Sequence, residues 1–273
     1  ICNQLFINFA EQLNLFDEII GINIKLFNKN LFHRFKKIKE ISKFSFYKVI
    51  HTTYSRDYYV GDSIVRALNS RCKIGCRSDT FNQSWIHLQI SNFWYSDLVE
   101  TGNFLQFEKN RNEKFLQNIG IEVEKIKYIL PVLEVENIIS SSYEDYILIC
   151  PGATELQRCW SPISFSKLIN ILCRKYNFNI ILCGAIADKK LSNLIIKNCN
   201  NKRVKDLVGK TNIVQLIELI RNADFIIGND SAPIHISYAV NRPSICISGG
   251  NNFERFVPYP NNLECAPITI FSE

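Results

Sequence analysis

Residues 225–237 read F-I-I-G-N-D-S-A-P-I-H-I-S and combine an apolar run, a polar turn and a proline. This order predicts a strand that ends near Gly228, a turn through Asp230 and Ser231, and a helix with Pro233 in its first turn. Gly228 gives the backbone freedom to bend after the strand. The unpaired N–H groups and the positive end of such a helix suit an anion. The stretch therefore predicts a phosphate-binding turn.

Other polar residues follow the ends of neighbouring predicted strands. Thr154 and Arg158 come after an apolar run at 146–150, and Asp188 comes shortly after a run at 179–183. The carboxyl ends of the strands in an open parallel sheet meet at one edge, where ligands bind. We therefore expect a single binding site. Its candidate residues are Thr154, Arg158, Asp188, Thr211, Asp230, Ser231, Ala232 and His235.

Each candidate also has a simpler structural interpretation. Asp230 or Ser231 can cap the helix that follows, and Asp188 can cap its own helix. His235 can be a packing residue, and Arg158 a solvated loop charge. The functional interpretation rests on the coincidence of several such residues at strand ends, where an arginine can offer two parallel N–H donors to one anion.

Short apolar strands alternate with amphipathic helices along the chain, which predicts an α/β fold with parallel sheets. In the first half we expect helices at about 4–15, 30–42, 57–68 and 112–118, and strands at 18–22, 47–51 and 72–75. In the second half we expect strands at 146–150, 179–183, 204–207, 224–228 and 243–248, with helices between them.

The segment 128–144 has few periodic positions and contains Pro131 and the run Ser140-Ser141-Ser142. Such a segment is typical of a connection between domains. We therefore expect an N-terminal Rossmann-like domain at 1–135 and a C-terminal Rossmann-like domain at 145–273.

Composition excludes several classes of protein. Hydrophobic residues make up 47% of the 273 residues, and no apolar run approaches the roughly 20 residues of a spanning helix. The ten cysteines show no C-x-x-C spacing, which favours a reducing cytosol without disulfides or a zinc site. No nucleic-acid motif accompanies the basic residues, so a nucleic-acid partner is not expected.

The net charge of +6 is concentrated in the first half, between Arg34 and Lys48. In a helix over this stretch, Leu31, Phe35 and Ile38 would share one face. That face can pack on a sheet while the basic side is solvated. Alternatively, the stretch attracts anionic lipid or an acidic saccharide.

Four strings of the second half carry a family resemblance: P-G-A-T-E-L-Q-R-C-W-S-P, I-I-L-C-G-A, L-V-G-K-T-N-I-V-Q-L-I-E-L-I-R-N-A-D-F-I-I-G-N-D-S-A-P-I-H-I-S-Y-A-V and R-P-S-I-C-I-S-G. In order and spacing they resemble glycosyltransferase family 9, the ADP-heptose:lipopolysaccharide heptosyltransferases and their relatives. The resemblance covers about 150–250. It implies a GT-B architecture, in which two Rossmann-like domains with parallel sheets face a cleft, with the acceptor on the N-terminal domain.

The resemblance also implies roles for the candidate residues. By motif position, Thr154 and Arg158 correspond to contacts with the donor phosphates, Asp188 to a ribose contact and Thr211 to a base contact. The loop that holds the diphosphate and sugar corresponds to Asp230, Ser231, Ala232 and His235. The family usually has Lys at the Arg158 position and commonly Gly at the Ala232 position.

The implied activity is inverting transfer of a sugar, with heptose from ADP-heptose as the expected donor, to a lipopolysaccharide or related lipid-linked saccharide. The chain contains no D-x-D motif, so we expect no metal and no other cofactor. The family's proposed base is an Asp after the first strand, which we expect upstream of residue 1, so no catalytic residue is assigned. We expect a cytoplasmic protein at the inner face of the bacterial inner membrane. A UDP-sugar donor and a non-catalytic nucleotide-sugar-binding protein remain as alternatives.

Overall fold

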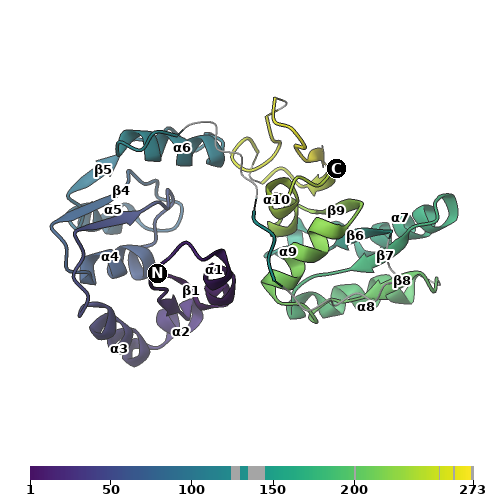
Figure 1. The fold of residues 1–273 in the computed structure, drawn as a ribbon, viewed down its shortest axis with the longest axis horizontal. Helices are drawn as coiled ribbons and strands as arrows, with labels where there is room; N and C mark the ends of the chain where they lie inside the picture. Colours follow the sequence, from purple (N-terminus) through teal and green to yellow (C-terminus); the bar gives the residue numbers. More distant parts are fainter. Residues whose placement is uncertain (124–129, 135–144, 200, 252, 261, 272–273) are drawn as a thin grey trace. The chain divides into compact units, whose positions relative to one another are not determined.

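The structure, a computed structural model, describes residues 1–123, 130–134, 145–199, 201–251, 253–260 and 262–271. The chain divides into two compact units (Figure 1). The first unit comprises Ile1–Ile7 and Phe16–Ile126, and the second comprises Asn8–Leu15 and Lys127–Glu273. Both contain parallel sheets with helices between the strands, so the expected α/β fold class is confirmed. The expected boundary falls at 128–144, of which only 130–134 lies within the described residues.

The second unit contains a six-stranded parallel sheet with the order β11-β10-β9-β6-β7-β8. Its strands are β6 (Tyr146–Cys150), β7 (Asn179–Leu182), β8 (Val204–Asp206), β9 (Phe225–Asn229), β10 (Ser244–Ser248) and β11 (Ile268–Phe271). The strands run outward from β6 in one direction and from β9 in the other. The strand order therefore reverses between β6 and β9, which is where such sheets bind ligands.

Helices connect these strands. They are α7 (Pro162–Lys175), α8 (Lys189–Lys197), α9 (Ile213–Asn222) and α10 (Ala232–Ala239), with short 3-10 turns at Leu156–Arg158 and Ile186–Asp188. The core between sheet and helices is apolar and mainly aliphatic, and Ile149, Phe165 and Ile180 are fully buried in it. Because these central strands are covered on both faces, they read in the sequence as continuous apolar runs.

The first unit has two separate sheets. β1 (Cys2–Asn3) pairs with β2 (Gly21–Ile22), and β3 (Lys48–His51), β4 (Cys72–Cys76) and β5 (Asp97–Val99) form a three-stranded parallel sheet. Its helices are α2 (Ile24–Lys29), α3 (Leu31–Ile41), α4 (Ser63–Ala67), α5 (Trp85–Asn92) and α6 (Glu108–Asn118). α1 (Ile7–Leu13) belongs largely to the second unit, where the Gln12 side chain donates to the Glu134 carbonyl at 3.0 Å.

The predicted elements of the first unit were confirmed only in part. The helix expected at 57–68 is present over nearly the same residues, but Tyr58–Asp62 is a π-helical turn and only α4 is α-helical. The prediction missed α2, whose N-cap Asn23 accepts the Leu26 N–H at 3.0 Å. Asn30 then ends α2 and caps α3 by accepting the His33 N–H at 2.9 Å. The two asparagine caps, seven residues apart, therefore separate α2 from α3, although the pattern of apolar residues shows no break between them.

Candidate functional site

Strands β6 and β9 approach each other closely at the point where the strand order reverses. Cys150 is the Cα partner of Gly228, and a Cβ atom on Gly228 would lie 2.9 Å from the Cys150 carbonyl oxygen. We expected Gly228 to form the turn, but it lies inside β9. The residue is glycine there because the neighbouring strand leaves no room for a side chain.

Asn229 ends β9 and is completely buried. Its side-chain amide donates to the Pro151 carbonyl at 2.6 Å and its oxygen accepts the Trp160 N–H at 2.9 Å. These two bonds hold both ends of the 151–160 loop against β9. The loop carries Arg158, so Asn229 fixes the position of that side chain.

Arg158 and Asp230 form the centre of the site. One guanidinium nitrogen of Arg158, Nη2, donates to both the carbonyl oxygen and the Oδ2 of Asp230, at 2.8 Å each. The Asp230 side chain is only 5% exposed, whereas that of Arg158 is 20% exposed. Arg158 therefore neutralises a buried carboxylate and still reaches solvent, where an anion can meet it.

His235 lies on the other side of the same carboxylate. Its Nε2 is 3.7 Å from Asp230 Oδ1, and its Nδ1 is 2.9 Å from the hydroxyl of Tyr259. Burial works to raise the pKa of Asp230, but the contact with His235 and the charge of Arg158 outweigh it, so the pKa is lowered. Asp230 is therefore an ionised group that positions two side chains.

The N-terminus of α10 begins beside this group. Ser231 occupies the N-cap position, but its hydroxyl donates to the Asn229 carbonyl at 3.1 Å and caps no N–H group. The Asp230 side chain caps none either, because it pairs with Arg158. The structural interpretation of both residues as helix caps is therefore wrong. Within the described residues, the N–H groups of Ser231 and Ala232 have no acceptor in the protein, which leaves two donors for an anion.

Asp188 sits over the carboxyl ends of β6 and β7. A Cβ atom on either Gly152 or Gly184 would collide with its carboxylate, so both glycines are needed for this approach. The carboxylate accepts the Ala185 N–H at 2.8 Å, and burial raises the pKa of Asp188. Asp188 is the N-cap residue of α8 but makes no capping bond to that helix; its bond to Ala185 instead closes a capping box on the 3-10 turn that leads into α8, so the capping interpretation is confirmed in part.

The two remaining candidates lie on adjacent loops. The Gly209 N–H donates to the Gly184 carbonyl at 2.9 Å, which ties the loop before α9 to the end of β7. On that loop, the Thr211 hydroxyl is 3.3 Å from Cys183 Sγ. Thr154 is exposed on the 151–160 loop. The structure thus brings Arg158 and His235 to the Asp230 carboxylate, with Ser231 and Ala232 next along the chain, and holds Thr154, Asp188 and Thr211 on loops that follow neighbouring strands.

Sequence reasoning missed Tyr259, which stacks on His235 with ring centroids 5.9 Å apart. Burial raises the pKa of this tyrosine, so it stays a neutral hydroxyl beside the imidazole. It lies in an irregular segment 24 residues after His235, where no periodic pattern indicates a partner.

Sequence reasoning also missed a polar cluster in the first unit. Asp62 Oδ1 accepts the hydroxyl of Tyr95 at 2.6 Å and lies 3.6 Å from Arg56 Nη1. The Tyr95 hydroxyl is 2.7 Å from His51 Nδ1, so the imidazole donates to it from Nδ1. Burial lowers the pKa of His51 to about 4, although Asp62 works to raise it. The pair Gly61-Asp62 is the only sequence signal at this place, and it belongs to the π-helical turn.

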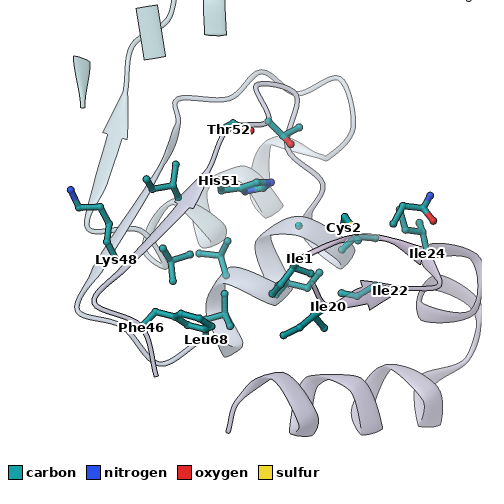
Figure 2. Close-up of a pocket in the computed structure, with 18 of the residues that line it drawn as sticks. Ile1, Cys2, Ile20, Ile22, Ile24, Phe46, Lys48, His51, Thr52 and Leu68 are labelled. Carbon is teal, nitrogen blue, oxygen red and sulfur yellow. The ribbon is translucent and has the colours of Figure 1, made fainter. Parts of the chain in front are cut away.

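An apolar groove of about 510 Å³ lies next to this cluster, between the two sheets of the first unit (Figure 2). In the described part of the chain β1 pairs only with β2 and β3 only with β4, so each strand has an open edge. Figure 2 shows His51 and Thr52 near one end of the groove and Phe46 and Leu68 near the other. Its apolar lining includes Ile1, Cys2, Ile20, Ile22, Phe46, Val49, Ile50, Val65 and Leu68.

Among the described residues, no three His, Cys, Asp or Glu side chains come together as a metal site. None of the helices in that part of the chain has the length and apolar character needed to cross a bilayer.

Comparison with known proteins gives consistent matches. The family model for glycosyltransferase family 9 (heptosyltransferase) matches residues 63–270. Lipopolysaccharide heptosyltransferase 3 of Escherichia coli strain K12 is 34% identical over 121 residues, which are 44% of this chain and 35% of that protein. A second Escherichia coli protein of the same name is 28% identical over 250 residues, which are 86% of this chain and 67% of the relative.

A solved structure extends the likeness to nearly the whole chain. Escherichia coli heptosyltransferase WaaC with ADP-2-deoxy-2-fluoro heptose superimposes with a TM-score of 0.72 and 14% sequence identity. The superposition covers 98% of this chain and 81% of that one. At this identity the likeness establishes the fold alone.

Proposed function

Because the chain belongs to glycosyltransferase family 9, we propose that it transfers heptose from ADP-heptose to a lipopolysaccharide or related lipid-linked saccharide. The observation that carries the proposal is the group Arg158, Asp230 and His235 at the N-terminus of α10. It lies at the reversal of strand order, where an open α/β sheet binds its ligand. The sequence relatives named lipopolysaccharide heptosyltransferase 3 support heptose as the transferred sugar.

We propose that the diphosphate of the donor binds between Arg158 and the N-terminus of α10. Only Nη2 of the guanidinium bonds to Asp230 in the described structure, so its other N–H groups can meet phosphate oxygens. The N–H groups of Ser231 and Ala232 and the positive end of the helix add to this attraction. His235 donates to a phosphate or sugar oxygen, and Thr154 lies on the loop that carries Arg158.

The nucleoside then extends toward β7. Asp188 bonds a ribose hydroxyl, since its carboxylate keeps one oxygen beyond the bond to Ala185. Thr211 contacts the base from the loop before α9. In this proposal the donor belongs to a domain at 145–273 and the acceptor to a domain at 1–135.

The proposed chemistry is one inverting displacement without a metal. An acceptor hydroxyl forms a bond to the anomeric carbon of heptose while the bond from that carbon to the diphosphate breaks. The electron pair leaves with the diphosphate, whose growing charge Arg158, His235 and α10 stabilise. The acceptor proton passes to a carboxylate base, to which no residue is assigned.

A lipid-linked acceptor determines where such an enzyme works. The lipid of such an acceptor holds its saccharide at a membrane surface. We therefore propose a cytoplasmic enzyme that works at the inner face of the bacterial inner membrane, without a nucleic-acid partner.

A donor screen followed by a transfer assay tests the proposal. We expect thermal stabilisation by ADP-heptose that exceeds the effect of UDP-, GDP- and CMP-sugars, because a ligand that binds only the folded state raises its melting temperature. We then expect an acceptor saccharide that is heavier by one heptose in mass spectrometry. Stabilisation by a UDP-sugar instead would contradict the proposal that ADP-heptose is the donor. Stabilisation by ADP-heptose without any transfer would point to a nucleotide-sugar-binding protein.

A further inference from the structure

Helix α3 presents three large apolar side chains to solvent. Leu31, Phe32 and Phe35 are 77%, 79% and 66% exposed. They lie at positions i, i+1 and i+4, on one side of the helix. The opposite side faces the core of the first unit, where Ile41 is fully buried and Ile38 is partly buried. The exposed side is therefore separate from the side that stabilises the fold.

This arrangement differs from the packing face expected from the sequence. A single face of Leu31, Phe35 and Ile38 would pack on a sheet, but only Ile38 turns inward. Adjacent exposed apolar side chains of this size usually mark an interaction surface. We therefore expect this exposed apolar surface to bind a partner.

Lysines surround these apolar side chains. Lys36 and Lys39 are exposed on the same side of α3, and α2, which packs against α3 (Figure 1), adds the exposed Lys25 and Lys29. Residues 25–43 contain seven basic residues and one acidic residue, a net of +6 that equals the charge of the whole chain. The single arginine of α3 is turned inward, because Arg34 Nε donates to the Phe27 carbonyl at 2.9 Å.

The mixture of side chains distinguishes a membrane from a protein partner. Protein interfaces are enriched in aromatic residues and Arg and depleted in Lys, so the exposed lysines around these apolar side chains, and not the phenylalanines, argue against a protein partner. Helices that lie on a membrane place Phe and Leu in the boundary between headgroups and acyl chains, with lysines beside anionic headgroups. We propose that Leu31, Phe32, Phe35, Lys36 and Lys39, the α3 surface, dock the protein onto an anionic lipid bilayer.

In this arrangement α3 lies in the plane of the membrane, with its core-facing side still packed on the first unit. The inference does not depend on sugar transfer, because it follows from the first unit alone and its test contains neither donor nor acceptor. If the protein does not bind vesicles, the proposed sugar transfer is unaffected. If the protein does not transfer a sugar, the proposed membrane binding by the α3 surface is unaffected.

Vesicle binding by the 273-residue protein tests the inference. We expect co-sedimentation with vesicles of phosphatidylcholine and phosphatidylglycerol, and little with phosphatidylcholine alone. Phe32→Ser should lower the partition coefficient about tenfold, because an apolar ring no longer leaves water. Lys36→Glu should lower it roughly 25-fold, since each charge near an anionic surface changes binding about fivefold. Raising the salt from about 0.1 M to about 1 M should also release the protein, because it screens the lysines.

Matched control variants lie elsewhere in the first unit. Phe93→Ser removes an aromatic ring that is 89% exposed, and Lys114→Glu reverses an exposed lysine on α6. Both should bind vesicles like the unchanged protein, and all four variants should keep its melting temperature. Equal losses in test and control variants, equal binding to neutral vesicles, or no binding at all would overturn the proposal. So would a dimer that Phe32→Ser converts to a monomer without any change in vesicle binding.

Discussion

The two units each contain an aspartate held by an arginine, a histidine and a tyrosine, but the two groups differ in access to solvent. In the second unit Asp230 pairs with Arg158 and lies near His235, whose Nδ1 contacts the Tyr259 hydroxyl. The Arg158 and His235 side chains are 20% and 34% exposed. This group can therefore exchange part of its contacts for a ligand.

In the first unit the same residue types are closed off. The Asp62 and Arg56 side chains are completely buried, Arg56 stacks on the Tyr95 ring at 4.4 Å, and Asn92 Oδ1 accepts from Arg56 Nη2. Only His51 reaches the surface of the groove. The same residue types therefore form two different groups. Burial distinguishes them, because removal of one partner from a fully buried ion pair leaves an uncompensated charge, whereas a partly exposed partner can turn to water.

The largest expected change in stability follows from breaking the buried ion pair of Asp62 and Arg56. Asp62→Asn keeps the shape of the side chain but leaves the Arg56 charge buried without a counterion, which should lower the free energy of unfolding by about 3–5 kcal/mol. Urea unfolding followed by circular dichroism measures this value. Asp230→Asn is the matched variant, and it should cost clearly less because Arg158 can turn toward water. Equal losses in the two variants would mean that burial does not separate the groups.

The next effect concerns the pH dependence of stability. Burial lowers the pKa of His51 to about 4 in the folded protein, whereas an unfolded histidine titrates near 6.5. Between these values the unfolded chain binds more protons, so stability is complete above pH 6.5 and falls as the pH drops toward 4. The total loss from this group is roughly 3 kcal/mol.

His51→Gln should remove most of this slope. The readout is the change in unfolding free energy between pH 6.5 and pH 5, where most carboxylates remain ionised. The groups that face His51 are Asp62, Arg56 and Tyr95, and none is altered in this variant. A slope as steep as that of the unchanged protein would assign the pH dependence to other groups.

The same difference in burial explains how much of the fold could be predicted. Strands β6, β7, β9 and β10 lie in the middle of a covered sheet, so their apolar runs stand out, and each was predicted to within one residue or so. In the first unit β1 and β2 have two residues each and β5 has three, which is too short for a pattern. β11 was missed because its residues are largely exposed at the edge of the sheet.

The site divides in the same way. The position of Arg158, Asp230 and His235 could be predicted because the carboxyl ends of parallel strands must meet. The contacts of Tyr259 with His235, and of Tyr95 with Asp62, join residues 24 and 33 positions apart, with helices and strands between them. No local rule links such residues, since their meeting depends on how loops pack.

In the partly exposed group of the second unit, Arg158→Ala should weaken binding of ADP about 10- to 100-fold. This factor corresponds to the free energy of a charge-assisted hydrogen bond to phosphate. Isothermal titration calorimetry measures the dissociation constant. Arg158→Lys, the residue usual in the family, should recover part of the affinity because it keeps the charge. Arg174→Ala, which removes an exposed arginine of α7 in the same unit, is the control and should bind ADP normally. If Arg158→Ala binds ADP with unchanged affinity, Arg158 does not contact the diphosphate.

The smallest expected effect comes from Ala232, where the family commonly has glycine. Ala232 is the first residue of α10 and is exposed, so its methyl group does not pack in the core. Ala232→Gly should lower the free energy of unfolding by about 0.5–1 kcal/mol, because glycine loses more backbone freedom on folding. ADP affinity should change less than about threefold, since the backbone N–H that meets the phosphate is the same in both residues. A larger gain in affinity, measured by the same titration, would mean that the methyl group holds the diphosphate away from the helix. The site around Arg158, Asp230 and His235 would then fit this donor poorly.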